Sequence, residues 1–323
     1  MIPGHRYAFR IIHPGSPLVR QRYPRGILVD PHGFPHWRPY ARATVALPEP
    51  LPELTLEEMR VVDVLAANEL MAVRGDPLWE FTREHYVRKT PPGWSWAHVA
   101  RSREVVLVPA ELHSSYRHLG GVSTMPVDRR RRGMRLDDDP RPTGVRPLQT
   151  VPADVLLDLE AHLGMALPPR YRDHLARTNG GEPVHVGVLS GAGFVADQPL
   201  FGLGRDDRHQ DLIGANNWLA DRFTDEFLAI GYVQGGMIAV KVRGAGTDSI
   251  WYWDDDDFRD DDAFDAAYIC AHLLHRCAAD IDEFWAALRN PAKLLLTLVA
   301  QLVESGDVHE LHPDGAGEAL GGG

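Results

Sequence analysis

The chain has 323 residues, of which 44% are hydrophobic and 24% charged. This balance is typical of a globular protein with enough apolar material for two cores. The longest apolar run, Leu294–Ala300, is interrupted by Thr297 and is far shorter than the roughly 18 residues that a membrane span needs. The N-terminus lacks the apolar segment of a signal peptide. Composition therefore excludes an integral membrane protein and predicts a cytoplasmic location.

Cysteine usage excludes two further classes of protein. Only Cys270 and Cys277 are present, so neither a disulfide scaffold nor a cysteine-rich metal centre can be built. Because they are seven residues apart, we expect them to share one face of a helix as small core residues.

Charge is distributed unevenly along the chain. Residues 1–150 contain 22 Lys and Arg against 16 Asp and Glu, and residues 151–323 contain 12 against 29, so the two halves carry +6 and −17. A basic half suits a polyanion such as nucleic acid. An acidic half can bind a basic partner or shield the basic half from that polyanion, and charge alone does not choose between these.

The first predicted elements lie in the basic half. Pro and Gly interrupt residues 1–53 so often that short strands and loops are expected there. Leu54–Arg74 is predicted to be a helix, because Thr55 and Glu58 have the spacing of a capping box and an apolar stripe follows. Further on, Trp94–His98 and Glu104–Val108 are typical of paired strands.

A helix is predicted directly after these strands, over Ala110–His118, ended by two glycines. This order can bring His98, His113 and His118 around one small space. Imidazole binds metal ions and takes protons near neutral pH, which are the two tasks of phosphodiester cleavage. Sixteen histidines are scattered through the chain, so ordinary surface or core positions are the alternative.

The remaining elements follow a charged segment. Pro126–Gln149 contains four prolines, four consecutive arginines and three consecutive aspartates, and is predicted to be a linker. Its arginine run is either a DNA contact or a solvated tether. Val151–Gly164 has the apolar spacing of an amphipathic helix, and the Gly-rich last dozen residues are predicted to be a disordered tail.

Two segments of the basic half resemble the HNH nuclease toxins. Pro92–Val99 reads Pro-Gly-Trp-Ser-Trp-Ala-His-Val where that family has a Trp-His-His strand. Val105–Ser123 then contains the Leu-Val-Pro, His and His-x-Gly-Gly elements in the family's order. Gly33–Ala41 and Asp63–Asn68 are similar to segments that precede this signature. The resemblance implies a ββα-metal (His-Me finger) nuclease domain over residues 1–125.

The resemblance also implies roles for single residues. His98 takes the position of the general base, and His113 and His118 take the positions of metal ligands. Ala97 stands where the family has a further ligand histidine, and a methyl group cannot coordinate a cation. Loss of a residue that merely orients a metal ligand commonly lowers metal affinity or activity by about 10–100-fold. Loss of a ligand itself is expected to cost at least as much. Ala97 is either an engineered inactivation or natural decay.

A metal-dependent nuclease of this kind needs a cation and contacts to its substrate. Magnesium is favoured for phosphate chemistry, whereas imidazole ligands suit zinc, nickel or manganese at least as well. Three arginines beside the motif are the predicted nucleic-acid contacts: Arg101, Arg103 and Arg117.

The acidic half resembles the SUKH superfamily, whose members are largely immunity proteins for nuclease toxins. Leu159–Gly181 is similar to its opening, and Phe227–Tyr232, Gly235–Val240 and Ile250–Asp254 follow as its short strands. Ala278–Leu288 is similar to its closing helix. The resemblance implies an α+β domain over residues 150–290, with a mainly antiparallel sheet flanked by helices, followed by a C-terminal helix and tail over 291–323.

An acidic run lies within this half. Asp254, Asp255, Asp256 and Asp257 are predicted to be a solvated surface, because the EF-hand spacing of a calcium site is absent. Such a surface can occupy the place of DNA phosphates, so we interpret it as an inhibitory surface toward a basic nuclease.

Together these patterns predict a two-domain α+β protein, an HNH-type DNA endonuclease toxin, inactive or weakened, fused to an immunity-like domain. The expected partners are DNA, a cognate toxin or immunity protein, or the two domains with each other. One alternative is a non-catalytic immunity or binding protein carrying a decayed nuclease domain. Another is an intact nuclease with a two-histidine site, which would cleave DNA without any repair of Ala97.

Overall fold

The computed structural model describes residues 9–49, 53–79, 88–116, 118–131, 133–136, 143–255, 257 and 264–311. We call residues 9–125 the N-terminal part and residues 150–290 the central part. The predicted disordered tail, residues 312–323, lies outside the described residues.

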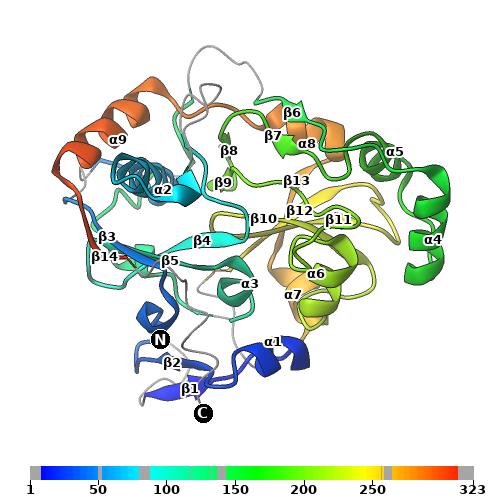
Figure 1. Cartoon of the computed structure of the whole chain (residues 1–323), viewed down its shortest axis with the longest axis horizontal. Helices are drawn as coiled ribbons and strands as arrows, with labels where there is room; N and C mark the ends of the chain where they lie inside the picture. The colour runs from blue at the N-terminus through cyan, green and yellow to red at the C-terminus, as the bar shows by residue number, and fades with distance from the viewer. Residues whose placement is uncertain are drawn as a thin grey trace.

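A four-stranded antiparallel sheet forms the centre of the N-terminal part (Figure 1). Its strand order is β14 (Asp307–Leu311), β3 (Ala43–Ala46), β5 (Glu104–Pro109) and β4 (Trp94–His98). The predicted pairing of the two motif strands is confirmed, with Trp94 opposite Pro109 and His98 opposite Val105. β14 belongs to the far end of the chain, so the C-terminal segment returns to complete this sheet.

Two helices, α2 (Leu56–Val73) and α9 (Lys293–Ser305), lie side by side over one face of this sheet (Figure 1). The predicted capping box at the start of α2 is confirmed. Thr55 Oγ1 accepts a hydrogen bond from the Glu58 backbone N, and Glu58 Oε2 accepts one from the Thr55 backbone N, both at 3.1 Å. These bonds satisfy two of the backbone N–H groups that a helix start leaves open.

The smaller elements of the N-terminal part frame the motif. They are β1 (Arg10–Ile12), α1 (Pro17–Arg22), β2 (Ile27–Val29), η1 (Arg38–Tyr40), η2 (Pro77–Trp79), α3 (Ala110–His113) and η3 (Gly121–Thr124). As expected from the prolines and glycines, residues 9–49 are mostly short strands and loops, but the six-residue helix α1 was not predicted.

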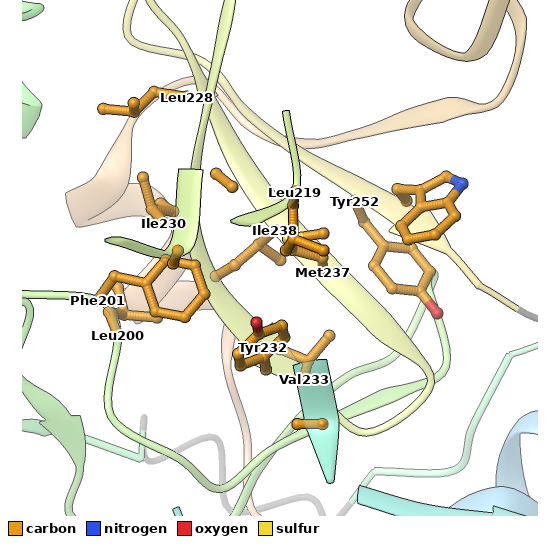
Figure 2. Close-up of a cluster of buried hydrophobic side chains, with 14 of the residues drawn as sticks. Leu200, Phe201, Leu219, Leu228, Ile230, Tyr232, Val233, Met237, Ile238 and Tyr252 are labelled. Atoms are coloured by element: carbon orange, nitrogen blue, oxygen red, sulfur yellow. The ribbon is translucent and has the colours of Figure 1, made fainter. Parts of the chain in front are cut away.

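The central part is built on a second antiparallel sheet, in the order β10 (Phe227–Val233), β11 (Gly236–Lys241), β12 (Ile250–Asp254) and β13 (Leu274–Ala278). Figure 2 shows the apolar side chains that gather at these strands, among them Ile230, Met237 and Ile238, which are fully buried. The hairpin between β10 and β11 needs Gly236, since a Cβ there would lie 2.0 Å from the Trp253 carbonyl oxygen.

Helices and short strands surround this second sheet. They are α4 (Ala153–Leu163), α5 (Pro169–Thr178), α6 (Leu212–Trp218), α7 (Ala266–His272), α8 (Ile281–Ala287), β6 (Val145–Arg146), β7 (Glu182–Pro183), β8 (Gly187–Leu189) and β9 (Phe194–Ala196). The helix expected over Val151–Gly164 is confirmed as α4. The prediction for the cysteines is wrong, because Cys270 lies in α7 and Cys277 in β13. The helix ends at His272, between the two cysteines, so the helical spacing does not apply to them.

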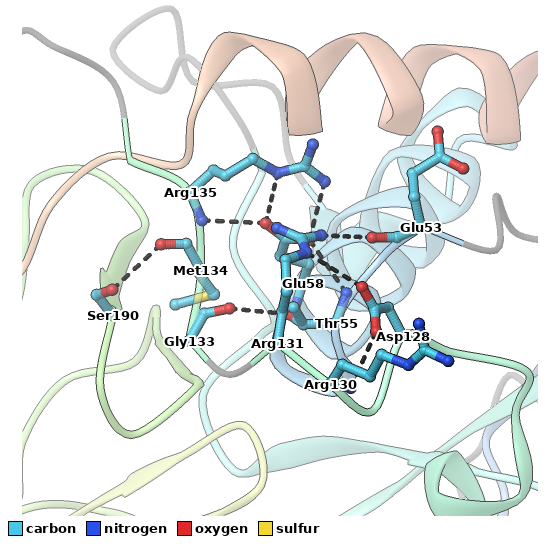
Figure 3. A network of polar contacts seen from close by, with 10 residues as sticks. All are labelled: Glu53, Thr55, Glu58, Asp128, Arg130, Arg131, Gly133, Met134, Arg135 and Ser190. Carbon is cyan, nitrogen blue, oxygen red and sulfur yellow. Dashed lines mark hydrogen bonds and ion pairs between the residues drawn. The ribbon is translucent and has the colours of Figure 1, made fainter.

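Within the predicted linker, Arg131 and Arg135 contact the start of α2 (Figure 3). Arg135 donates through Nε and Nη2 to Glu58 at 2.6 and 2.8 Å, and Arg131 Nη2 lies 3.3 Å from the same carboxylate. Burial acts to raise the pKa of Glu58, but the hydrogen bonds from Arg135 and Thr55 outweigh it and lower the pKa. Two arginines of the linker are therefore held at α2, because a buried carboxylate needs cationic partners. Arg129, Arg130 and Arg131 of the arginine run are exposed, so the choice between a DNA contact and a solvated tether stays open for them.

The N-terminal and central parts share their hydrophobic cores. One cluster joins Val106 and Tyr116 to strands of the central part, and a second joins α2 to Val188 and Val195. The two parts therefore pack as neighbours in one body, with the motif strands and α3 against the central part (Figure 1).

Candidate functional site

Successive residues of β4 face opposite sides of the sheet, as strand geometry requires. On the side of α2, Trp96 Nε1 donates to Asn68 Oδ1 at 2.8 Å, and His98 Nε2 donates to Asp63 Oδ2 at 3.0 Å. Ala97 packs on the other side, in the cluster that contains Tyr116. The structure thus separates the candidate base from the position of the missing ligand. His113 and His118 pack on Trp37, which belongs to the same cluster as Ala97. The three histidines therefore do not surround one space, contrary to expectation, because alternation along β4 turns the His98 ring toward α2.

Asp63 is the centre of a buried polar group on the α2 side. Besides His98, it receives two hydrogen bonds from Arg103, from Nη1 to Oδ2 and from Nη2 to Oδ1, both at 2.8 Å. Burial acts to raise the pKa of Asp63, but the bonds from His98 and Arg103 outweigh it and hold the pKa below its usual value. Asp63 belongs to a segment that is similar to the family in sequence, but no role was predicted for its carboxylate, although an aspartate between Val62 and Val64 in an apolar helix is a signal of a buried partner.

The three arginines predicted to contact nucleic acid have different surroundings. The Arg103 guanidinium is already hydrogen-bonded within the protein, because its Nη atoms donate to Asp63 and its Nε donates to the Pro48 carbonyl at 2.9 Å. A phosphate would have to replace these partners. Arg101 is exposed, with its guanidinium 5.7 Å from the centre of the Phe34 ring. Arg117 lies outside the described residues.

The two candidate metal ligands lie together. The expected helix over Ala110–His118 is shorter than predicted, since α3 ends at His113. After this end the chain folds back, so that the rings of His113 and His118 are 4.9 Å apart between centres. Trp37 packs against both, at 5.1 and 5.0 Å. The wide angle that a continuous helix would place between these histidines is therefore avoided.

Both imidazoles are oriented through Nδ1. His113 Nδ1 donates to Asp255 Oδ2 at 2.8 Å, and His118 Nδ1 donates to the Tyr116 carbonyl at 3.0 Å. A neutral imidazole that donates through Nδ1 has its lone pair on Nε2, and metal-bound histidines typically have such a carboxylate or carbonyl partner. The chemistry of the pair fits a divalent cation. However, among the residues that the structure describes, no group of three His, Cys, Asp or Glu is arranged to hold a metal ion.

The glycine pair at the end of the motif closes over β4. A Cβ on Gly121 would lie 2.0 Å from the His98 carbonyl oxygen, so only glycine permits this approach. Next to it, Thr124 Oγ1 accepts a hydrogen bond from the Arg101 backbone N at 2.8 Å. The chain after His118 is thereby fastened to the end of the strand that carries His98.

The central part covers the outer edge of β4. Gln198 accepts from the Gly93 backbone N at 3.1 Å and donates to the Trp94 carbonyl at 2.5 Å. Gln234 Oε1 accepts from the Trp96 backbone N at 3.0 Å. Two glutamine side chains thus satisfy backbone groups that an edge strand leaves open.

The acidic run also reaches the N-terminal part. Asp255 contacts His113, and Asp254 lies 3.6 Å from the Arg60 guanidinium on α2. The expectation of a solvated surface is wrong, because Asp255 and Asp257 are buried. Asp256 lies outside the described residues. Asp255 can be buried here because the neighbouring part supplies its partner.

Comparisons with known families agree with this division of the chain. Residues 88–128 match the WHH family, described as a nuclease of the HNH/ENDO VII superfamily with conserved WHH. Residues 150–286 match the SMI1/KNR4 family (SUKH-1). No curated protein matched the chain. Both resemblances and the α+β fold class are thereby confirmed: a WHH nuclease segment is followed by a SUKH-1 segment.

The structure adds one observation on membranes. Within the described ranges, no helix combines the length and the apolar character needed to span a bilayer.

Proposed function

We propose that the N-terminal part is a DNA endonuclease toxin domain that acts in the cytoplasm, and that Ala97 leaves it inactive or weakened. The central part is proposed to be its immunity-like partner within the same chain. The observation that carries this proposal is the His113–His118 pair, which lies inside the WHH match and on the same side of β4 as Ala97. The excess of positive charge in residues 1–150 suits a polyanionic substrate.

Nucleases of the HNH/ENDO VII group depend on a divalent metal ion. In this chain His113 and His118 would hold the ion, with Asp255 and the Tyr116 carbonyl orienting them. A bound cation supplies neutralisation of charge on the phosphate and the leaving oxygen. Magnesium is the favoured ion, with zinc, nickel and manganese as alternatives because of the imidazole ligands.

His98 is the proposed general base, and because its ring faces α2 while His113 and His118 pack in the cluster of Ala97, this role requires β4 to rearrange when the site opens. Because Nε2–H is donated to Asp63, the atom able to accept a proton is Nδ1. Arg103 fixes Asp63 from the other side and so holds the imidazole in this tautomer. Asp63 and Arg103 are therefore proposed as positioning residues, and the exposed Arg101, together with Arg117, as contacts to DNA.

One observation favours the alternative, a non-catalytic immunity or binding protein. Ala97, His98, His113 and His118 are each at most 9% exposed, so a phosphodiester has no access to them in this conformation. The nuclease proposal therefore requires that the central part opens away from the motif. The binding-protein reading requires no such opening.

The test is restoration of the ligand by Ala97→His in the full chain. We expect divalent-ion affinity, measured by calorimetry with Mn²⁺, Ni²⁺ and Zn²⁺, to rise at least about 10-fold, because a third imidazole joins the pair. Ala97→Leu is the matched control, since it adds comparable volume at this buried position without a ligand atom. Equal affinity in the two variants would reject the metal assignment.

Plasmid nicking tests the activity itself. In the Ala97→His background, the further change His98→Ala is expected to lower cleavage by about 10²–10⁴, the usual contribution of a positioned base, while leaving ion affinity unchanged. Equal cleavage with and without His98 would make that histidine structural.

A further inference from the structure

The turn that joins the two candidate ligands is enclosed by the central part. This finger turn, Ala110–Tyr116, consists of α3 and the residues that follow it, and every one of its side chains is buried. Three separate segments of the central part reach it. The first contact is Asp255 on His113, described above, which joins residues 142 positions apart in the sequence.

A buried arginine makes the second contact. Arg222 donates through Nε to the Ser114 carbonyl at 3.2 Å and through Nη2 to the Ser115 carbonyl. These carbonyls stand at the C-terminal end of α3, where helical carbonyls lack partners and a positive charge is favourable. The guanidinium also lies 5.6 Å from the centre of the Trp253 ring, two residues before Asp255. Arg222 and Asp255 therefore contact the finger turn from neighbouring positions of the central part.

The third contact lies at the start of the turn. Glu111 accepts a hydrogen bond from Tyr23 Oη at 2.5 Å, and His209 Nε2 lies 4.0 Å from the same carboxylate oxygen. Burial lowers the pKa of His209 to about 4, so the imidazole is neutral at physiological pH, and at 4.0 Å it packs against the carboxylate without a hydrogen bond or an ion pair. All three side chains are buried.

We infer that His209, Arg222 and Asp255 form a socket that binds the finger turn and holds the candidate site closed in the intact chain. The inhibitory role of the socket rests on the proposed function. The contacts that form the socket do not, because they are observed between described residues. The finger turn is enclosed over its whole length, and the candidate base and metal ligands lie beneath the surface. The central part thus acts as an inhibitor in cis by enclosing the site.

This mechanism differs from inhibition by surface charge. Charge shielding between exposed groups weakens as ionic strength rises, because the Debye length falls from about 10 Å at 0.1 M to about 3 Å at 1 M salt. Arg222 and Asp255 are 3% and 1% exposed, so their contacts are screened much less. The socket is expected to hold the turn nearly as well at 1 M salt as at 0.1 M.

Hydrogen exchange of the full chain tests the socket without reference to activity. The reporters are the backbone N–H groups of Ser114 and Ser115, which are bonded to the Ala110 and Leu112 carbonyls. Arg222→Met and Asp255→Leu are expected to raise their exchange on the order of 100-fold, since each leaves a buried partner uncompensated. Arg243→Met and Asp282→Leu, which change exposed charges of the same part, are the matched controls and should change nothing.

Amides of the β10–β11 hairpin show whether a variant unfolds the whole chain. Should they also exchange faster, Arg222→Lys and Asp255→Asn replace the first pair, because they keep a donor and an acceptor at the same places. With these milder variants we expect about a 10-fold rise confined to the finger turn. Unchanged exchange at Ser114 and Ser115 in whichever pair leaves the hairpin intact would overturn the socket.

Cleavage assays in the Ala97→His background separate the socket from the nuclease proposal. A rise in both exchange and plasmid nicking supports both. Faster exchange with no nicking in any metal supports the socket and rejects the nuclease. Nicking that is equal with and without the socket variants, together with unchanged exchange, rejects the socket and leaves the nuclease proposal standing.

Discussion

A buried carboxylate between the two parts gives a prediction about pH. Asp197 follows β9 in the central part and is fully enclosed, and its Oδ2 accepts a hydrogen bond from the Thr90 backbone N at 2.8 Å. Burial raises the pKa of Asp197 from 3.8 to about 6, although the hydrogen bonds from Thr90 and Gln234 oppose the rise. The folded state therefore binds this proton more tightly than the unfolded state does.

The sign and size of the effect follow from linkage. Stability from this group is fully present below pH 3.8, where both states are protonated, and is lost as the pH rises through about 6. A difference of about two pKa units corresponds to roughly 3 kcal/mol at 1.36 kcal/mol per unit. Asp197→Asn keeps an oxygen to accept the Thr90 bond but cannot ionise. Relative to the native chain, the unfolding free energy of the variant should therefore rise by about 2 kcal/mol between pH 4.5 and 7.5, because about 1.5 of the two pKa units lie above pH 4.5.

Urea unfolding at pH 4.5, 6 and 7.5 measures this gain. Val195→Ala, a buried change on β9 without a titratable group, is the control, and its difference from the native chain should be the same at all three values. If the difference between Asp197→Asn and the native chain is also constant with pH, or shrinks as pH rises, the reasoning from burial is wrong.

Three further changes test other contacts. Gly121→Ala should lower the unfolding free energy by about 1–3 kcal/mol, because its Cβ would overlap the His98 carbonyl oxygen, and a chain that melts at the native temperature would contradict this. Glu58→Ala should lower the unfolding free energy by about 1–3 kcal/mol, because Arg135 loses its buried partner. Proteolysis of the linker residues around Arg135 should then become faster. An unchanged rate of proteolysis would mean that other contacts hold the linker. Ending the chain after residue 290 removes α9 and β14 and so uncovers α2 and the edge of β3. Light scattering should then show that the truncated chain self-associates, and a monodisperse product would contradict this role of the C-terminal segment.

Local pattern in the sequence predicted the elements whose formation is governed by neighbouring residues. The capping box at Thr55 and Glu58 began a helix because its two hydrogen bonds span only three residues. The pairing of Trp94–His98 with Glu104–Pro109 followed from two β-rich segments joined by a short turn. The motifs around these elements were specific enough to indicate both families, which the comparisons confirmed.

Contacts between distant segments were decided only by the tertiary structure. His113 meets Asp255, and β3 pairs with β14, across separations that carry no local signal. The acidic run appeared solvated from its composition, yet Asp255 is buried, because whether a charge is exposed depends on what packs against it. The end of α3 at His113 also depends on a distant residue. In a longer helix the carbonyls of Ser114 and Ser115 would accept hydrogen bonds from later backbone N–H groups, whereas here they accept them from Arg222. Sequence specifies which groups need partners, and packing determines which distant residues supply them.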